Sequence, residues 1–399
     1  MLHQRRSAQS NGIRIAICVT CLVLTAVGIL FVHSTTADGG AFPSRAAKGQ
    51  IAKAAVGILA LLVVARIDYR RWERYGSVIY AVLVLVLVAM LIDKFATGGR
   101  NRFIDLGFFQ IQPSAFMMIA LVLGLARYLR FRQDQRRVSG LVAPFLLTLG
   151  PMALVLLQPN LGLSLLFPPV LIGMLFVAGS KPRHLALAVF LGFATLPAAY
   201  FLSATLPVMK VYQKERLREF FGHKSHHLQQ SLIAVGSGGV TGKGLGEGTQ
   251  NRLGHLPAKD TDFIFSIVAE ELGFVGAASL VVLFLLLTVL ILRVAVSTRE
   301  PFGRLVATGF GVALAVQCFE NIGMTLGLTP ITGIPLPFVS LAGSSLVATY
   351  LAMAIVLNIS SRRVRVVAPK DLDPPEATNL EVLREDRPAG LLQARWPVE

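Results

Sequence analysis

Long apolar runs recur along this chain and restrict its fold more than any other feature. Residues 274–292, FVGAASLVVLFLLLTVLIL, hold no charged side chain in 19 positions. A helix that crosses the hydrocarbon core of a bilayer needs about 20 mostly apolar residues. The whole chain is 54% hydrophobic and only 15% charged, which is expected when helices of this kind make up most of it.

Ten such runs predict ten transmembrane helices. They lie near residues 13–33, 50–66, 77–93, 114–131, 141–157, 161–179, 184–206, 273–295, 303–326 and 338–360. The predicted fold class is therefore an all-α polytopic membrane protein, with one large extracytoplasmic loop, residues 207–262, between helices 7 and 8. We expect residues 1–365 to form one integral membrane domain. The polar, Pro-containing residues 366–399 are expected to be a disordered cytoplasmic tail.

The basic residues predict how the chain is oriented in the membrane. If the N-terminus and every second loop are cytoplasmic, that side holds 24 of the 38 Lys and Arg residues. An excess of Lys and Arg on the cytoplasmic side is the rule for membrane proteins. We therefore expect both termini in the cytoplasm. The same loops account for the net charge of +16, so nucleic acid is not an expected partner.

Three acids stand just before one of the longest apolar runs, in the stretch AKDTDFIFSIVAEELG (258–273). On this topology Asp262, Glu270 and Glu271 lie at the outer mouth of the helix, in a short helix set off by Gly273. Ionisable groups at membrane depth are costly and often functional. Two plainer readings stay open: Asp262 as a helix N-cap, and Glu270 and Glu271 as interfacial charges.

Several blocks of the sequence resemble one family. The resemblance is carried by QSLIAVGSGGVTGKGLGEGTQNRLGHLPAKDTDFIFSIVAEELG (230–273), NIGMTLGLTPITGIPLPFVSLAGSS (321–345), GGRNRFIDLGFFQIQPS (98–114), QPNLG (158–162) and YQKER (212–216). These blocks, in their order along the chain and within a ten-helix plan, are similar to those of the SEDS proteins (shape, elongation, division and sporulation), the RodA/FtsW/SpoVE family.

The resemblance implies a peptidoglycan glycosyltransferase. Such proteins polymerise lipid II at the outer face of the bacterial cytoplasmic membrane, usually beside a class B penicillin-binding protein, in elongation, division or sporulation. The resemblance therefore implies that this chain lies in the cytoplasmic membrane of a bacterium. The family's catalytic Asp in TDFIF corresponds to Asp262. A lipid pyrophosphate leaves in this reaction, and we expect Arg102, Arg216 and Lys243 to bind it, because they are basic residues of the matched motifs. A divalent cation, Mg or Mn, could assist the carboxylate; no metal ligands are assigned and no organic cofactor is expected.

Five positions depart from the family's motifs, and three of them replace a charged side chain by a neutral one. The usual QPSExxK reads QPSAFMM, which places Ala115 and Met118 where the family has Glu and Lys. The usual QPDLGT reads QPNLGL, which places Asn160 and Leu163 where it has Asp and Thr, and the usual RW reads RF, which places Phe103 where it has Trp. A non-catalytic scaffold for a penicillin-binding protein could lose those charges, so it stays an alternative, as does a lipid-precursor transporter. The retained DTDFIF motif favours the polymerase.

Overall fold

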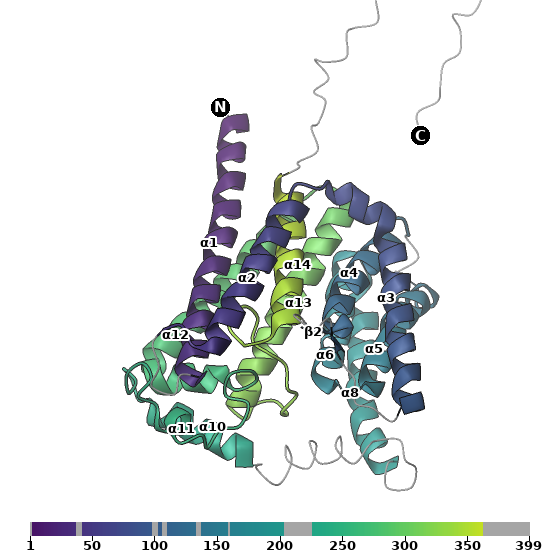
Figure 1. Cartoon of the computed structure of the whole chain (residues 1–399). Helices are drawn as coiled ribbons and strands as arrows, with labels where there is room; N and C mark the ends of the chain where they lie inside the picture. Colours follow the sequence, from purple (N-terminus) through teal and green to yellow (C-terminus); the bar gives the residue numbers. More distant parts are fainter. Residues whose placement is uncertain are drawn as a thin grey trace, which may run out of the picture. The chain divides into compact units, whose positions relative to one another are not determined.

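Helices dominate the computed structural model of this chain (Figure 1). The structure describes residues 2–36, 42–97, 103–105, 110–132, 137–158, 160–202 and 226–361. The elements are α1 (Leu2–Thr36), α2 (Arg45–Val64), α3 (Tyr69–Thr97), β1 (Ile104–Asp105), β2 (Gln110–Ile111), α4 (Pro113–Arg130), the 3₁₀ helix η2 (Ser139–Leu141), α5 (Val142–Leu157), α6 (Leu161–Leu165), α7 (Phe167–Val177), α8 (Pro182–Leu202), α10 (His226–Ser237), α11 (Thr249–Arg252), α12 (Ile264–Ser297), α13 (Pro301–Thr325) and α14 (Gly343–Ser361).

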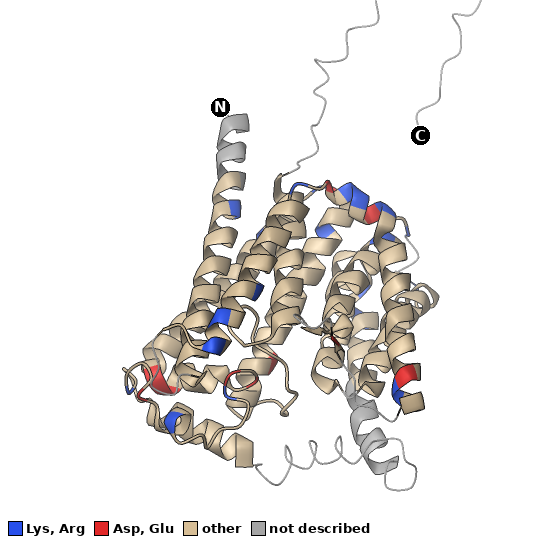
Figure 2. Ribbon diagram, viewed as in Figure 1, with Lys and Arg blue, Asp and Glu red and all other residues tan. Residues whose placement is uncertain are grey.

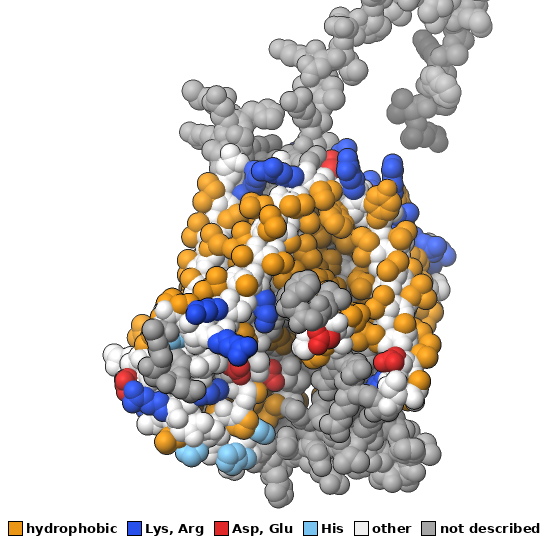
Figure 3. Space-filling model, viewed as in Figure 1, with side chains coloured by type: hydrophobic (Ala, Val, Ile, Leu, Met, Phe, Trp, Pro, Cys, Tyr) orange, Lys and Arg blue, Asp and Glu red, His pale blue; other side chains and the backbone are white. Residues whose placement is uncertain are grey.

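Eight stretches of the described chain are long and apolar enough to cross a membrane. They are Asn11–Thr36, Arg45–Val64, Tyr69–Thr97, Pro113–Arg130, Ser139–Leu157, Ile264–Ser297, Pro301–Thr325 and Gly343–Ser361. Several turn large apolar side chains outward; on α3, Leu85, Ile92 and Phe95 are 67%, 64% and 71% exposed. Figure 3 shows hydrophobic side chains covering the helices between the two polar ends. A surface of this kind suits lipid rather than water, so the chain is a multi-span membrane protein.

The other two predicted spans fall on shorter or partly described helices. The segment predicted at 161–179 is divided into α6 and α7, of 5 and 11 residues. The division falls at Leu166, before the prolines at 168–169, because proline lacks the N–H that continues a helix and its ring clashes with the preceding turn. The segment predicted at 184–206 coincides with α8 as far as Leu202.

Three of the basic loops lie together at one end of the helices. Arg130, at the end of α4, forms ion pairs with Glu73 on α3 and with Glu300 before α13, the latter with Nε 3.4 Å from Oε1. Arg127 donates to the carbonyl of Glu73 over 2.8 Å. Figure 2 shows Lys and Arg gathered at this end. The three loops therefore share a side, which agrees with their assignment from the sequence.

Helix α12 is broken near its start. Gly273 has φ 65° and ψ −165°, a conformation that residues with a Cβ rarely adopt. A Cβ there would also collide with the backbone of Val240 and Gly242. The predicted short helix set off by Gly273 is confirmed, and it begins at Ile264.

The segment before α12, residues 226–262, is folded against this break. Its backbone N–H groups at Lys243 and Gly244 donate to the carbonyls of Glu270 and Glu271, over 3.1 and 3.0 Å. The sequence predicted a loop over 207–262. Residues 207–225 lie outside the described part of the chain, and the remainder contains the helices α10 and α11.

Helices α1 and α2 pack closely against α14 and the segment before it. A Cβ on Gly57 of α2 would lie 2.5 Å from Cδ2 of Tyr350 on α14. A Cβ on Gly28 of α1 would lie 2.5 Å from the carbonyl oxygen of Phe338 and 2.7 Å from the Cα of Val339. The Tyr350 hydroxyl of α14 lies 2.6 Å from the Thr25 hydroxyl of α1. These contacts fix the segment between α13 and α14 against the N-terminal helices.

The close approach of Gly28 to the backbone of Phe338 and Val339 makes Gly28→Ala a sensitive test of the packing. We expect it to lower the free energy of unfolding by about 1–3 kcal/mol, because the added methyl group meets backbone that must shift. Gly12 lies on the same helix with nothing within 4 Å, so Gly12→Ala should be neutral or stabilising by up to about 1 kcal/mol. Thermal unfolding of both variants in one detergent is the measurement. Identical melting temperatures would contradict the close approach of α1.

Candidate active site

A pocket of about 580 Å³ lies beside the start of α12. Its walls come from α2, the β1–β2 hairpin, the first residues of α4 and α6, and the segment between α13 and α14. Among the described residues that line it, the charged side chains are Asp262, Asp105 and Lys53. A few converging polar groups in a large concave site are typical of a place where a ligand binds.

Hydrogen bonds to the backbone carbonyls of Thr261 and Asp262 hold Asp262 at this pocket. The Asn321 side chain of α13 donates to the carbonyls of Asp262 and Ile334, over 2.9 and 2.6 Å. The Ser340 hydroxyl donates to the carbonyl of Thr261 over 2.5 Å. The loop that carries Asp262 is thereby joined to α13 and to the segment that follows α13.

The N-cap reading of Asp262 is not supported by this geometry. The N-cap of α12 is Phe263, and no side-chain cap hydrogen bond is made there. The Asp262 Oδ2 atom instead lies against Gly333, where an added Cβ would be 3.3 Å from it. The carboxylate therefore belongs to the wall of the pocket rather than to the end of the helix.

The hairpin brings a second carboxylate, Asp105, to the same pocket. Strands β1 and β2 are antiparallel, with Asp105 opposite Gln110. The Ser344 hydroxyl of α14 donates to the Gln110 carbonyl over 2.9 Å and accepts from the Gln112 N–H over 3.0 Å. Asp105 was missed by sequence reasoning, although it lies inside the matched block at 98–114 and could have been found there.

The donor set of the pocket fits a hard divalent cation only in part. Asp105 and Asp262 offer carboxylate oxygens, which Mg²⁺ and Mn²⁺ prefer. The described residues contain no group of three His, Cys, Asp or Glu side chains placed to hold a metal ion. Mg²⁺ is commonly bound by one or two carboxylates together with substrate phosphates, and two carboxylates lining one pocket suit that arrangement.

Of the three basic residues proposed from the sequence, the structure describes only Lys243. Arg102 and Arg216 lie outside the described part of the chain. Lys243 does not line the pocket, since its ammonium lies 2.7 Å from the Glu270 carboxylate. Lys53, which does line the pocket, was missed; a charge inside the apolar run at 50–66 was the available signal.

Glu270 and Glu271 are buried rather than interfacial, each with 0% of its surface exposed. Glu270 accepts from Lys243 Nζ, from the Thr249 hydroxyl over 3.0 Å and from the Gln250 N–H over 3.1 Å. A buried carboxylate is tolerated when it is paired and hydrogen-bonded in this way. Glu270 therefore holds the segment 226–262 onto the short helix.

Glu271 holds a different part of the molecule. Its two oxygens accept from the Ser34 hydroxyl at the end of α1, over 2.6 and 2.7 Å. The Asn251 side chain of α11 also donates to it over 2.8 Å. The three acids thus have different roles: Asp262 lines the pocket, whereas Glu270 and Glu271 secure the structure around it.

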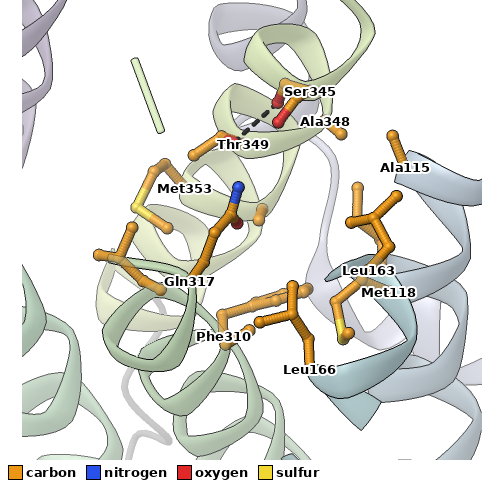
Figure 4. A pocket seen from close by; sticks show the side chains of 14 residues that line it. Ala115, Met118, Leu163, Leu166, Phe310, Gln317, Ser345, Ala348, Thr349 and Met353 are labelled. Atoms are coloured by element: carbon orange, nitrogen blue, oxygen red, sulfur yellow. Dashed lines mark hydrogen bonds between the residues drawn. The ribbon is translucent and has the colours of Figure 1, made fainter. Parts of the chain in front are cut away.

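Three of the residues that depart from the family's motifs, Ala115, Met118 and Leu163, line a second, smaller pocket of about 60 Å³. In Figure 4, Ala115 and Met118 of α4 lie across it from Gln317 and Phe310 of α13. Most of its lining is apolar. Without a charged group at 115 or 118, this space has the character of a hydrocarbon site.

The two pockets adjoin each other. Ala115, Leu163 and Ser345 line both, so an apolar space continues from the pocket of Asp262 into the helices. Asn160 lines the larger pocket and caps α6, where its Oδ1 accepts from the Leu163 N–H over 3.3 Å. Asn160 therefore stabilises the start of α6 as its N-cap.

Comparison with known proteins supports one family. A family model described as cell cycle protein, for FtsW, RodA and SpoVE, matches residues 14–365. The probable peptidoglycan glycosyltransferase FtsW of Geobacter metallireducens is 36% identical over 367 residues, which are 87% of this chain and 94% of that protein. The peptidoglycan glycosyltransferase MrdB of Escherichia coli K12 is 36% identical over 322 residues, or 79% of this chain and 85% of that protein.

Solved structures have the same fold. A chain from a study of structural coordination of polymerization and crosslinking by a peptidoglycan synthase complex is similar with a TM-score of 0.73 and 29% identity, covering 88% of this chain and 98% of that one. Thermus thermophilus RodA is similar with a TM-score of 0.64 and 27% identity, over 88% of this chain and 97% of RodA. Since the family model and relatives at 36% identity each span most of its length, the chain belongs to the FtsW, RodA and SpoVE family of cell cycle proteins.

Proposed function

We propose that this protein polymerises lipid II, the lipid-linked peptidoglycan precursor, into glycan strands at the outer face of the cytoplasmic membrane. The observation that carries the proposal is that the Asp262 carboxylate lines a pocket of about 580 Å³ beside the start of α12. The chain around it has the sequence of this family. The relatives named peptidoglycan glycosyltransferases support the same reaction class.

Asp262 is suited to act as a general base in this reaction. A sugar hydroxyl oxygen of one precursor attacks the anomeric carbon of the other, and the bond from that carbon to the pyrophosphate oxygen breaks. The lipid pyrophosphate leaves with the bonding electron pair, and Asp262 takes the hydroxyl proton. The apolar space beyond Ala115 and Leu163 fits hydrocarbon.

Arg102 and Arg216 remain proposed substrate-binding residues from the matched motifs. Lys243 is assigned instead to the buried ion pair with Glu270. A divalent cation, Mg or Mn, would be held by Asp262 and Asp105, and would neutralise charge on the phosphates when bound.

The proposal includes a topology of ten spans with both termini in the cytoplasm and residues 207–262 outside. Cysteine labelling with a membrane-impermeant maleimide tests it. Val240 is 67% exposed in the segment before α12, so Val240→Cys should be labelled in intact cells. Arg70, exposed at the opposite, basic end, is the matched control, and Arg70→Cys should be labelled only after lysis. The reverse pattern would invert the topology.

A class B penicillin-binding protein is the proposed partner. The similar chain from the peptidoglycan synthase complex supports an assembly of this kind. A non-catalytic scaffold for such a partner is the second candidate, and the neutral side chains at Ala115, Met118 and Asn160 are the observation that favours it.

Polymerisation of purified lipid II separates the two candidates. The protein is co-purified with its partner in mild detergent and supplied with Mg²⁺ or Mn²⁺, and glycan strands are separated by length. The polymerase predicts strands whose synthesis survives a penicillin that blocks crosslinking. A verified complex that makes no strands with either metal would favour the scaffold.

A further inference from the structure

Lys53 is the basic side chain in the pocket among the described residues that line it. It lies eight residues after the start of α2, about 12 Å along the helix at 1.5 Å per residue. A lysine at such a place in an apolar helix is costly unless its ammonium finds a polar partner. Within the described part of the chain, no hydrogen bond or ion pair to Lys53 is present.

The neighbours of Lys53 fix its place relative to Asp262. One turn earlier on α2, the Gln50 amide donates to the Ser340 carbonyl over 3.1 Å. The Ser340 hydroxyl in turn donates to the carbonyl of Thr261, the residue before Asp262. Two short bonds therefore connect the helix that carries the lysine to the loop that carries the carboxylate.

The stem of Lys53 also has a fitted place. A Cβ added to Gly343, the first residue of α14, would lie 2.7 Å from the lysine Cδ and 3.0 Å from its Cε. The middle of the lysine side chain therefore packs against the start of α14, at the wall of the pocket. A methyl group at position 343 would displace it.

We propose that Lys53 binds the phosphate groups of a polyprenyl pyrophosphate in the pocket, opposite the general base Asp262. This assignment rests on the proposed function, since it names the residue that receives the leaving group of that reaction. An ammonium beside a diphosphate forms charge-assisted hydrogen bonds and stabilises the negative charge that develops on it. The adjoining apolar space lined by Ala115 and Leu163 would receive the first part of the prenyl chain.

A binding measurement that needs no turnover tests the assignment. The full-length protein in phosphatidylcholine nanodiscs is titrated with undecaprenyl pyrophosphate, with undecaprenol as the uncharged comparison. Lys53→Met keeps the length of the side chain without its charge, and we expect it to weaken pyrophosphate binding about 10- to 100-fold. Undecaprenol binding should be unchanged, and Lys53→Arg should recover most of the affinity.

Controls separate the site from general charge effects. Lys48 lies exposed on the same helix and outside the pocket, so Lys48→Met should bind as the wild type does. Gly343→Ala retains the charge but crowds the lysine stem, and should also weaken binding. It serves as the second variant if Lys53→Met does not fold. Nanodiscs with phosphatidylglycerol test a headgroup as the source of the phosphate; full competition by this lipid would overturn the pyrophosphate assignment.

Two further results would overturn the assignment: equal affinity of Lys53→Met and wild type, or equal losses in Lys53→Met and Lys48→Met. The experiments distinguish failure of the proposed function from failure of the Lys53 site. A wild type that makes no glycan but binds undecaprenyl pyrophosphate through Lys53 would retain the site and lose the polymerase. A polymerase unaffected by Lys53→Met would retain the function and lose the site.

Discussion

Asp262→Asn is expected to lower the rate of glycan synthesis by about 10²- to 10⁴-fold, the usual contribution of a general base. Asparagine has nearly the same shape but cannot take the proton of the attacking hydroxyl. The bonds that position the loop are made by the backbone of Asp262 and Thr261, so they survive the substitution. The rate of strand formation from lipid II, with the partner bound, is the measurement.

Asp260 provides the matched control for this variant. It lies two residues earlier in the same loop, and its side chain does not line the pocket. The backbone carbonyl of Asp260 accepts a hydrogen bond from the Leu341 N–H over 2.9 Å, and this bond does not involve the side chain. Asp260→Asn should keep its activity. Full activity in Asp262→Asn, with the melting temperature unchanged, would remove Asp262 from catalysis.

Lys243→Met is expected to lower the free energy of unfolding by about 3–5 kcal/mol, because it leaves the Glu270 carboxylate buried without its cation. Glu270 is fully buried in this pair, whereas 25% of the Lys243 side chain is exposed. The double variant Lys243→Met/Glu270→Gln should be more stable than the single one, since it removes the unpaired charge as well. Denaturant unfolding in detergent measures both.

The exposed pair of Arg252 and Glu247 is the comparison, with side chains 60% and 54% exposed. Arg252→Met should cost only about 0–1 kcal/mol, as usual for surface pairs. Measuring the affinity of the folded Lys243→Met variant for lipid II tests the substrate-binding role that the sequence suggested for Lys243. If Lys243→Met kept full stability and lost only its affinity for lipid II, that role would be restored and the structural one rejected.

Much of the fold could be predicted because it depends on local patterns. Runs of apolar residues give the helices, Gly273 gives the break in α12, and the Pro-Pro pair at 168–169 explains why one predicted span is divided. The roles of Glu270 and Glu271 could not be predicted in this way. Their partners include Ser34, which is 237 residues from Glu271 in the chain, and nothing near the acids in the sequence points to it.

Part of the site could be predicted because it also depends on a local pattern. Asp262 was identified through the TDFIF motif, which is local. Lys53 and Asp105 meet it only when α2, the hairpin and the α13–α14 segment come together, and that arrangement depends on backbone bonds such as the one from Ser340 to Thr261. A charge pattern read along one helix does not reveal which other segment it will face.

The bond between Ser34 and Glu271 also has a consequence for how the protein is made. Ser34 leaves the ribosome early, and its acidic partner follows 237 residues later. At about 5–20 residues per second, the interval is roughly 10 to 50 s. During that time α1 is in the membrane without the contact that fastens its end. The contact that fastens α1 to the short helix is therefore formed late in biosynthesis, and the pocket is completed later still, because residues up to Ser345 line it.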